Sequence, residues 1–197
     1  MKTLVLATRN PGKVREMRAL LADLPVVVQS LADYPQVPEI AETGTTFAEN
    51  ATLKARAVAA ATGHLALADD SGLEVDALDG APGVYSSRFA GPDATDADRN
   101  ALLLEKLRDV PAPQRTARFV AAVAIATPAG ELHLTQATCE GRIACQPRGE
   151  HGFGYDPIFL LPERGQTMAE LSPEEKNQIS HRARAVAQAR EILRTLV

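Results

Sequence analysis

Short apolar runs alternate with amphipathic segments in the first third of the chain. Thr3–Ala7 predicts a buried strand, and the residues after Asn10 predict a helix whose apolar positions share one face. Val26–Val28 and Leu65–Ala68 predict two more strands, and the alanine-rich segment Thr46–Thr62 predicts a helix between them. Strands and helices that alternate in this order predict an α/β fold.

The second half of the chain has a different pattern. Arg118–Thr127 and Glu131–Glu140 predict two strands that form a hairpin, and the segment from Thr95 through Leu107 predicts a helix. Ser172 is followed by a proline and a reciprocal glutamate, which together indicate a helix start, and helical sequence continues nearly to Val197. No internal repeat or flexible linker divides the chain.

The composition fits one medium-sized domain, residues 1–197. The 197 residues are 45% hydrophobic and carry a formal charge of −4, which argues against a broad nucleic-acid-binding surface but allows a single small polyanion as partner. Cys139 and Cys145 do not match a zinc-ligand pattern, so we expect reduced thiols. No apolar run approaches the ~18 residues that cross a bilayer, and we expect a cytoplasmic protein without membrane contact.

Two adjacent carboxylates follow the apolar run Leu65–Ala68. Asp69 and Asp70, with Ser71 and Gly72 after them, come at the C-terminal end of the predicted strand, where α/β sheets bind ligands. Adjacent carboxylates repel one another, so a cation or a shared proton is the expected compensation, and we predict a magnesium–phosphate site. The alternative is a local turn in which Asp70 or Ser71 hydrogen-bonds to the backbone before Gly72.

The first strand-to-helix junction suits a phosphate group, because backbone N–H groups and the positive end of the helix dipole converge there. The residues at this junction are Thr8, Arg9, Asn10, Pro11, Gly12 and Lys13. The junction is not a Walker A loop, because the glycine spacing is absent and Val14 follows Lys13 where serine or threonine would hold magnesium. The alternative is that Lys13 is an ordinary surface lysine.

The predicted helix Thr46–Thr62 has a face that begins polar and ends apolar. Asn50 and Lys54 lie on the first turns of this face, which indicates that these turns line a pocket. Lys54 would meet phosphate oxygens there, and Glu42 just upstream would join the two aspartates as a metal ligand. The alternative is that the Lys54 ammonium extends into water and Glu42 is a solvated loop acid.

The loop Gly149–Pro157 combines three glycines, the aromatic side chains of Phe153 and Tyr155, and the acid Asp156. Aromatic faces stack on bases and a carboxylate accepts hydrogen bonds from ring N–H groups, so the loop suits a nucleobase. The alternative is a tight turn whose Phe153 and Tyr155 anchor the core.

Three cationic or imidazole side chains lie on the last helical segment: Lys176, His181 and Arg182. Lysine and arginine can donate to base oxygens and ring nitrogens. In one continuous helix His181 and Arg182 would point about 100° apart, whereas a break at Ser180 would let both face one pocket. The alternative is that all three are solvated residues of a helix surface.

Taken together, these residues resemble a known family, the non-canonical purine nucleoside triphosphate pyrophosphatases, also called inosine or xanthosine triphosphate pyrophosphatases. The matching motifs occur in family order over nearly the whole chain and are Thr8-Arg9-Asn10 with Lys13, Glu42-Thr43-Gly44 with Phe47, Glu49-Asn50-Ala51 with Lys54-Ala55, Asp69-Asp70-Ser71-Gly72-Leu73, Asp76-Ala77-Leu78, Gly80-Ala81-Pro82-Gly83, Phe153-Gly154-Tyr155-Asp156-Pro157, Glu175-Lys176 and Ser180-His181-Arg182. One departure is Arg9, where many members carry glycine.

The resemblance implies a mixed central sheet with flanking helices, in two lobes around a central cleft, and a homodimer. It implies magnesium-dependent hydrolysis of ITP, dITP, XTP and dXTP to the monophosphate and pyrophosphate, which removes such nucleotides from the pool. Glu42 and Asp70 would engage magnesium, and Asp69 would either bind the metal or support Asp70. Asp70 would be the catalytic base, and the substrate-binding residues would be Thr8, Arg9, Asn10, Pro11, Gly12, Lys13, Lys54, Ser71, Phe153, Gly154, Tyr155, Asp156, Lys176, His181 and Arg182.

Two other functions fit part of this pattern. A related pyrophosphatase of pyrimidine or modified nucleotides would share the phosphate chemistry and read the base differently. A regulatory module would bind nucleotide without turning it over.

Overall fold

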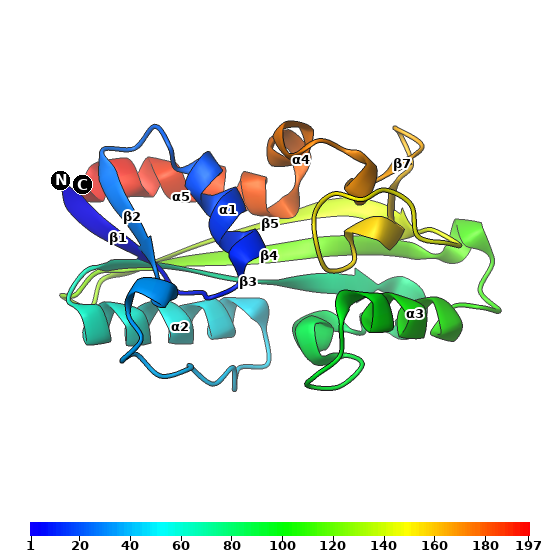
Figure 1. Cartoon of the computed structure of the whole chain (residues 1–197), viewed down its shortest axis with the longest axis horizontal. Coiled ribbons are helices and arrows are strands. Elements are labelled where there is room, and N and C mark those ends of the chain that lie inside the picture. Colours follow the sequence, from blue (N-terminus) through cyan, green and yellow to red (C-terminus); the bar gives the residue numbers. More distant parts are fainter. The chain divides into compact units, whose positions relative to one another are not determined.

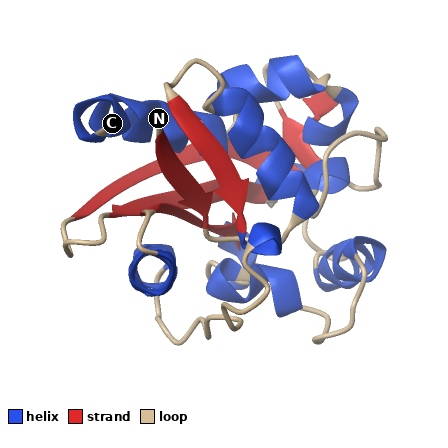
Figure 2. Ribbon diagram, turned by 60° about the vertical axis from the view of Figure 1, so that its left-hand side comes forward, coloured by secondary structure: helices blue, strands red, loops and turns tan.

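The α/β class and the mixed sheet expected from the sequence are confirmed by the computed structural model, which describes all 197 residues. Seven strands pair in the order β2-β1-β3-β4-β5-β6-β7, and helices flank them (Figure 1; Figure 2). The strands are β1 Lys2–Leu6, β2 Val26–Ser30, β3 Leu65–Val75, β4 Thr116–Ala126, β5 Leu132–Ile143, β6 Phe159–Leu161 and β7 Gln166–Thr167. The helices are α1 Pro11–Leu20, α2 Phe47–Thr62, α3 Asp96–Lys106, α4 Pro173–Ile179 and α5 His181–Leu196. β1 runs parallel to β2 and β3, whereas β5, β6 and β7 are antiparallel neighbours.

The chain divides into two compact units. Unit 1 comprises residues 1–70, 121–137 and 182–197, and unit 2 comprises residues 71–120 and 138–181. None of the helices has the length and apolar character that crossing a membrane requires. Cys139 is buried in β5 and Cys145 is exposed, and neither forms a disulfide.

The core of unit 1 follows from the alternation of side chains along its strands. Leu4 and Leu6 of β1 lie beside Leu65 and Leu67 of β3, and this face packs against α1 and α5. The alternate residues point to the opposite face, which α2 covers (Figure 1). The two chain ends lie side by side, and the Lys2 ammonium donates to a main-chain carbonyl in the last turn of α5.

The core of unit 2 is a separate apolar cluster. Leu73 and Val75 of β3 pack with Leu103 of α3 and with Phe159 of β6, and all four side chains are buried. In this unit α3 lies on one face of the strands and α4 on the other (Figure 1). Unit 2 therefore has a hydrophobic core of its own.

The helix ends follow the capping chemistry expected from the sequence. Asn10 caps α1, with its side chain accepting from the backbone N–H groups of Gly12 and Lys13. Thr46 and Glu49 form a capping box at the start of α2, and Gly63 ends that helix in the left-handed conformation with φ 69°. Similar boxes open α3 and α4. The structure confirms these four helix starts. They could be predicted because each depends on residues within one turn.

The structure corrects one expectation and decides between the two alternatives for the last helical segment. The strand expected to stop at Ala68 continues through the two aspartates to Val75, so the alternative of a local turn before Gly72 is wrong. The acids lie within a central strand because side chains from other elements provide the compensating charge, as described below. The last helical segment is broken at Ser180, which ends α4 before α5 begins at His181.

Candidate functional site

Seven charged side chains of unit 1 form one network, here called the charged cluster. Its members are Lys13 and Glu16 of α1, Glu42, Lys54 of α2, Asp69 and Asp70 of β3, and Arg182 of α5. Six of the seven belong to the predicted site, and the structure brings these six together from segments far apart in the chain. Glu16 is the seventh, and the motifs did not point to it.

The Lys54 ammonium is the centre of the first half of the cluster. It lies 2.8 Å from Glu42 Oε1, 2.8 Å from Asp70 Oδ1 and 3.0 Å from the main-chain oxygen of Asp69. Lys54 and Asp70 are buried, while the Glu42 side chain is 27% exposed. The alternative in which Lys54 extends into water is therefore wrong. One cation holds the two predicted metal-binding carboxylates together.

Asp69 is the centre of the second half. Its Oδ2 lies 2.7 Å from Lys13 Nζ and 3.2 Å from Arg182 Nη2, and the Lys13 ammonium also donates to the Asp69 main-chain oxygen at 3.3 Å. The other amino group of Arg182 donates to Glu16 Oε2 at 2.5 Å. The Lys13 side chain is 16% exposed, so the alternative of an ordinary surface lysine is wrong as well.

The two adjacent aspartates have different protonation behaviour. Burial raises the pKa of the Asp70 carboxyl, and the Glu42 charge adds to this while the Lys54 ammonium opposes it. Burial also disfavours the charged form of Asp69, but Arg182 and Lys13 outweigh it and hold the pKa of Asp69 well below its usual range. Asp69 thus stays ionised, and Asp70 is the member of the pair suited to take up a proton.

Burial lowers the pKa of Lys13, and the like charges of Lys54 and Arg182 add to that effect, although Asp69 opposes it. Burial also disfavours the charge on Lys54, but Asp70 and Glu42 outweigh it, so the pKa of Lys54 is raised. For Glu42 the Lys54 charge outweighs burial, and its pKa is lowered. Lys54 therefore keeps its charge while it bridges the two carboxylates.

The junction before α1 is arranged around Asn10. The Thr8 hydroxyl accepts from the Asn10 backbone N–H at 3.1 Å, and the Arg9 guanidinium donates to the Val37 carbonyl at 2.6 Å. The Asn10 side-chain oxygen accepts hydrogen bonds from the backbone N–H groups of Gly12 and Lys13. Arg9, the departure from the family pattern, thus ties the junction to the long loop after β2.

The loop that carries Glu42 is fixed by Asn50. This side chain is fully buried, and its Oδ1 accepts from the Gly44 backbone N–H at 2.8 Å. A Cβ on Gly44 would lie 2.7 Å from that oxygen, so only glycine allows this approach. Asn50 thereby fixes the backbone at Gly44, two residues after Glu42.

The predicted base-binding residues of unit 2 form a second group. The Lys176 ammonium lies 2.5 Å from Asp156 Oδ2 and 4.8 Å from the centre of the Phe153 ring. Asp156 also accepts from the Phe153 backbone N–H at 2.9 Å, which fixes the turn, while the Gly154 carbonyl accepts from Asn100. Phe153 is only partly buried.

Two other predicted base-binding residues face the core of unit 2. Tyr155 is buried, and its hydroxyl donates to the Ser86 carbonyl at 2.7 Å. Burial raises the pKa of the Tyr155 phenol. The His181 ring is buried and stacks on Phe119, with 4.7 Å between the ring centres. For Tyr155 the geometry agrees with the alternative of a core anchor, whereas Phe153 is not part of the core cluster.

Ser71 follows Asp70 in β3 and is partly buried.

Glu16 is the functional candidate that the sequence motifs did not indicate. A signal was present, because Glu16 lies three residues after Lys13 and therefore on the same side of the helix. Its partner Arg182 lies 166 residues away, which no local pattern reveals.

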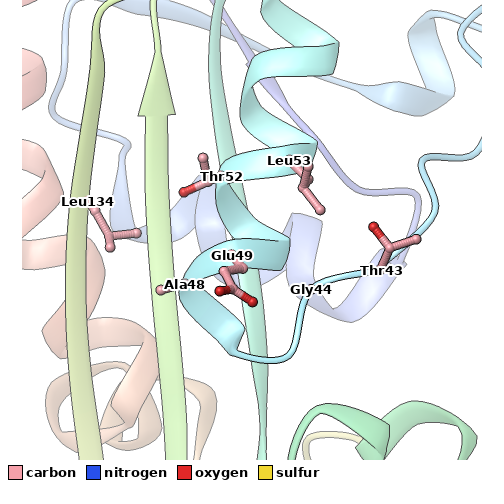
Figure 3. Close-up of a pocket in the computed structure, with 7 residues that line it drawn as sticks. All are labelled: Thr43, Gly44, Ala48, Glu49, Thr52, Leu53 and Leu134. Atoms are coloured by element: carbon pink, nitrogen blue, oxygen red, sulfur yellow. The ribbon is translucent and has the colours of Figure 1, made fainter.

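A groove of about 500 Å³ lies beside α2 in unit 1. It is lined by Thr43, Gly44, Ala48, Glu49, Thr52, Leu53 and Leu134 (Figure 3). None of these is a predicted site residue, and the charged cluster does not line the groove. The groove is thus distinct from the candidate site.

The comparison with known proteins agrees with the motifs. Residues 4–192 match the model of the Ham1 family. This chain belongs to the Ham1 family. The family resemblance expected from the sequence is therefore confirmed.

Relatives of this Ham1-family chain carry names that indicate an activity. A protein named dITP/XTP pyrophosphatase from Geobacillus kaustophilus (strain HTA426) is 59% identical over 191 residues, which cover 97% of this chain and 94% of the relative. Another of that name from Exiguobacterium sibiricum is 56% identical over 194 residues, or 98% of each chain. The solved structure of a HAM1 protein from Coxiella burnetii matches with a TM-score of 0.90 and 46% identity, covering 99% of this chain and all of the other.

Proposed function

We propose that this chain is a magnesium-dependent nucleoside triphosphate pyrophosphohydrolase that converts dITP, ITP, XTP and dXTP to the nucleoside monophosphate and pyrophosphate. The observation that carries the proposal is the sharing of one ammonium, that of Lys54, by Glu42 and Asp70. The names of the relatives support the same activity.

The residues present fit a magnesium ion. Glu42 and Asp70 supply carboxylate oxygens that already share one cation, and Mg²⁺ is commonly held by one or two carboxylates together with substrate phosphates and water. No group of three or more His, Cys, Asp or Glu side chains is placed so that it could hold a metal ion by itself, so substrate phosphates and water would complete the ligand set. Glu42 and Asp70 would hold the ion, and the ion would supply positive charge to the phosphate oxygens.

The chain's own residues would perform the remaining steps. Asp70 would accept a proton from the water that attacks the α-phosphorus, and its raised pKa suits a general base. The bond between that phosphorus and the bridging oxygen breaks, and pyrophosphate leaves. Lys13 and Lys54 would offset the negative charge that develops on the departing pyrophosphate. Asp69, held by Lys13 and Arg182, would support this arrangement without titrating.

For the base, we propose recognition by the second group. Phe153 offers an aromatic face, Asp156 accepts from ring N–H groups, and Lys176 donates to the purine 6-oxo oxygen. Adenine presents an amine at that position, so the donor would be left unpaired and ATP would be a poor substrate. We also expect the chain to form a homodimer.

The test is pyrophosphate release from dITP, ITP, XTP, GTP, ATP, dTTP and UTP, with and without Mg²⁺. We expect release from the first three that depends on the metal. Asp70→Asn should lose nearly all turnover and still bind nucleotide, because the amide cannot accept the proton. Preference for dTTP or UTP would favour a pyrimidine pyrophosphatase, and tight triphosphate binding without product would establish a regulatory module.

A further inference from the structure

Glu16 lies outside every motif used so far, yet it is part of the charged cluster. It is in α1, one turn after Lys13, and its side chain is 13% exposed. Its Oε2 accepts from Arg182 Nη1 at 2.5 Å, and the Arg182 side chain is 2% exposed. A carboxylate that binds a buried guanidinium at this distance forms a charge-assisted hydrogen bond of the strong kind.

The contacts from Glu16 close a ring that returns to α1. Arg182 Nη2 donates to Asp69 Oδ2 at 3.2 Å, and the same oxygen lies 2.7 Å from Lys13 Nζ. Helix α1 therefore supplies both ends of the chain of contacts, with α5 and β3 as the intermediate links. In this ring two cations, Lys13 and Arg182, face two anions, Glu16 and Asp69.

The Glu16 contact determines which amino group of the Arg182 guanidinium donates to Asp69. An arginine prefers to bind a carboxylate through two parallel N–H bonds. Because one amino group is engaged by Glu16, the guanidinium reaches Asp69 with the other, and Asp69 Oδ2 is shared with the Lys13 ammonium. Without the Glu16 charge, Arg182 can turn to bind Asp69 through both amino groups and compete with Lys13 for it.

We propose that Glu16 is a positioning residue that acts through Arg182 and Asp69 to hold the Lys13 ammonium in place for the phosphates of the substrate. This inference rests on the proposed function for its consequence in binding, but the placement of Lys13 can be measured without any substrate. In this proposal Lys13 is the residue that would contact the phosphates, and Glu16 would act on binding only through Arg182 and Asp69.

The test uses Glu16→Gln, which keeps the size of the side chain and removes its charge. In the protein without nucleotide, labelling by acetic anhydride with read-out by mass spectrometry should modify Lys13 at least threefold faster in Glu16→Gln than in the unmodified protein. In turnover assays, the inhibition constant of inorganic pyrophosphate should rise about tenfold, and in a Lys13→Met background Glu16→Gln should add less than a twofold change.

A matched control is Asp23→Asn. Asp23 also accepts from arginines of α5, Arg190 and Arg194, but it lies outside the charged cluster. This variant should leave the Lys13 labelling rate and the pyrophosphate inhibition constant within twofold. Thermal unfolding of each variant identifies a loss of fold. Glu16→Asp keeps the charge, so in a folded protein it should change the Lys13 labelling rate and the inhibition constant less than Glu16→Gln does.

Two results would overturn the inference: an unchanged Lys13 labelling rate in folded Glu16→Gln, or an equally large effect of Glu16→Gln on the inhibition constant in the Lys13→Met background. A protein that releases no pyrophosphate from any triphosphate would overturn the proposed function instead, and the labelling rate would still decide whether Glu16 positions Lys13.

Discussion

Replacing Lys54 by methionine is expected to tighten the binding of a divalent cation to the nucleotide-free protein. In the structure the Lys54 ammonium lies between the same carboxylate oxygens that would bind the metal, 2.8 Å from Glu42 and 2.8 Å from Asp70. A metal bound by these oxygens would therefore compete with the ammonium for one position. Lys54→Met keeps a similar length of apolar side chain and removes the competing charge.

The expected size of the effect follows from the two contacts. A hydrogen bond to a charged group contributes about 1.5 kcal/mol or more, so giving up two of them costs about 3 kcal/mol when the metal displaces the ammonium. At 25 °C this corresponds to about 100-fold in the dissociation constant. Pairing with Asp70 and Glu42 outweighs burial and raises the pKa of Lys54, so the competition persists at neutral pH.

The assay is titration with Mn²⁺ followed by electron paramagnetic resonance of the free ion, with no nucleotide present. Arg56→Met is the matched control, because Arg56 is an exposed residue of the same helix and its removal changes the net charge equally. We expect about 100-fold tighter binding for Lys54→Met and less than threefold for Arg56→Met. Equal Mn²⁺ affinity of folded Lys54→Met and the unmodified protein would refute the competition.

Three further predictions concern stability and geometry. The Asp69 pKa is low in the folded protein, so its contribution to stability is present above pH ~4 and is lost as the pH falls; between pH 5 and pH 3 the unmodified protein should lose about 1.2 kcal/mol more than Asp69→Asn in urea unfolding. Gly44→Ala should lower the free energy of unfolding by about 1–3 kcal/mol and reduce pyrophosphate release, because the new Cβ would lie 2.6 Å from Glu49 Cβ. Asp156→Ala should cost about 3–5 kcal/mol in urea unfolding, because it leaves the buried Lys176 ammonium without this carboxylate.

The controls for these variants come from exposed positions. Glu105→Ala removes an exposed carboxylate paired with Arg108 and should change the free energy of unfolding by no more than about 0.5 kcal/mol. The same pH slope in Asp69→Asn and the unmodified protein would contradict the assignment of Asp69 as permanently ionised. Full stability of Asp156→Ala would show that the pair with Lys176 adds nothing, and full activity of Gly44→Ala would show that the Glu42 loop tolerates a shift.

Local chemistry explains why some features could be predicted from the sequence. The caps at Asn10, Thr46, Thr95 and Ser172 depend on residues within one turn, and each is present in the structure. The continuous apolar runs in β1 and β3 likewise predicted buried strands, and residues 4–7 and 65–68 are all buried. These features need no information from distant parts of the chain.

Long-range pairing explains what could not be predicted. Asp69 and Asp70 have the composition of a turn, and they continue a strand because Lys13, Lys54 and Arg182 supply charge from three helices. Glu16 has no special neighbour in sequence apart from Lys13. The gathering of Lys13, Glu42, Lys54 and Asp70 was expected. The place of Arg182 beside Asp69, rather than with Lys176, required the structure.

The position of Asp70 within β3, rather than in a loop after it, affects the thermodynamics of ligand recognition. A flexible segment that carries a ligand-binding acid must give up its backbone freedom on binding, at about 1–2 kcal/mol per residue. Here β1 and β4 flank the strand, so that entropy is already lost when the protein folds. Affinity for a charged nucleotide can then arise with little entropic penalty from ordering this part of the polypeptide.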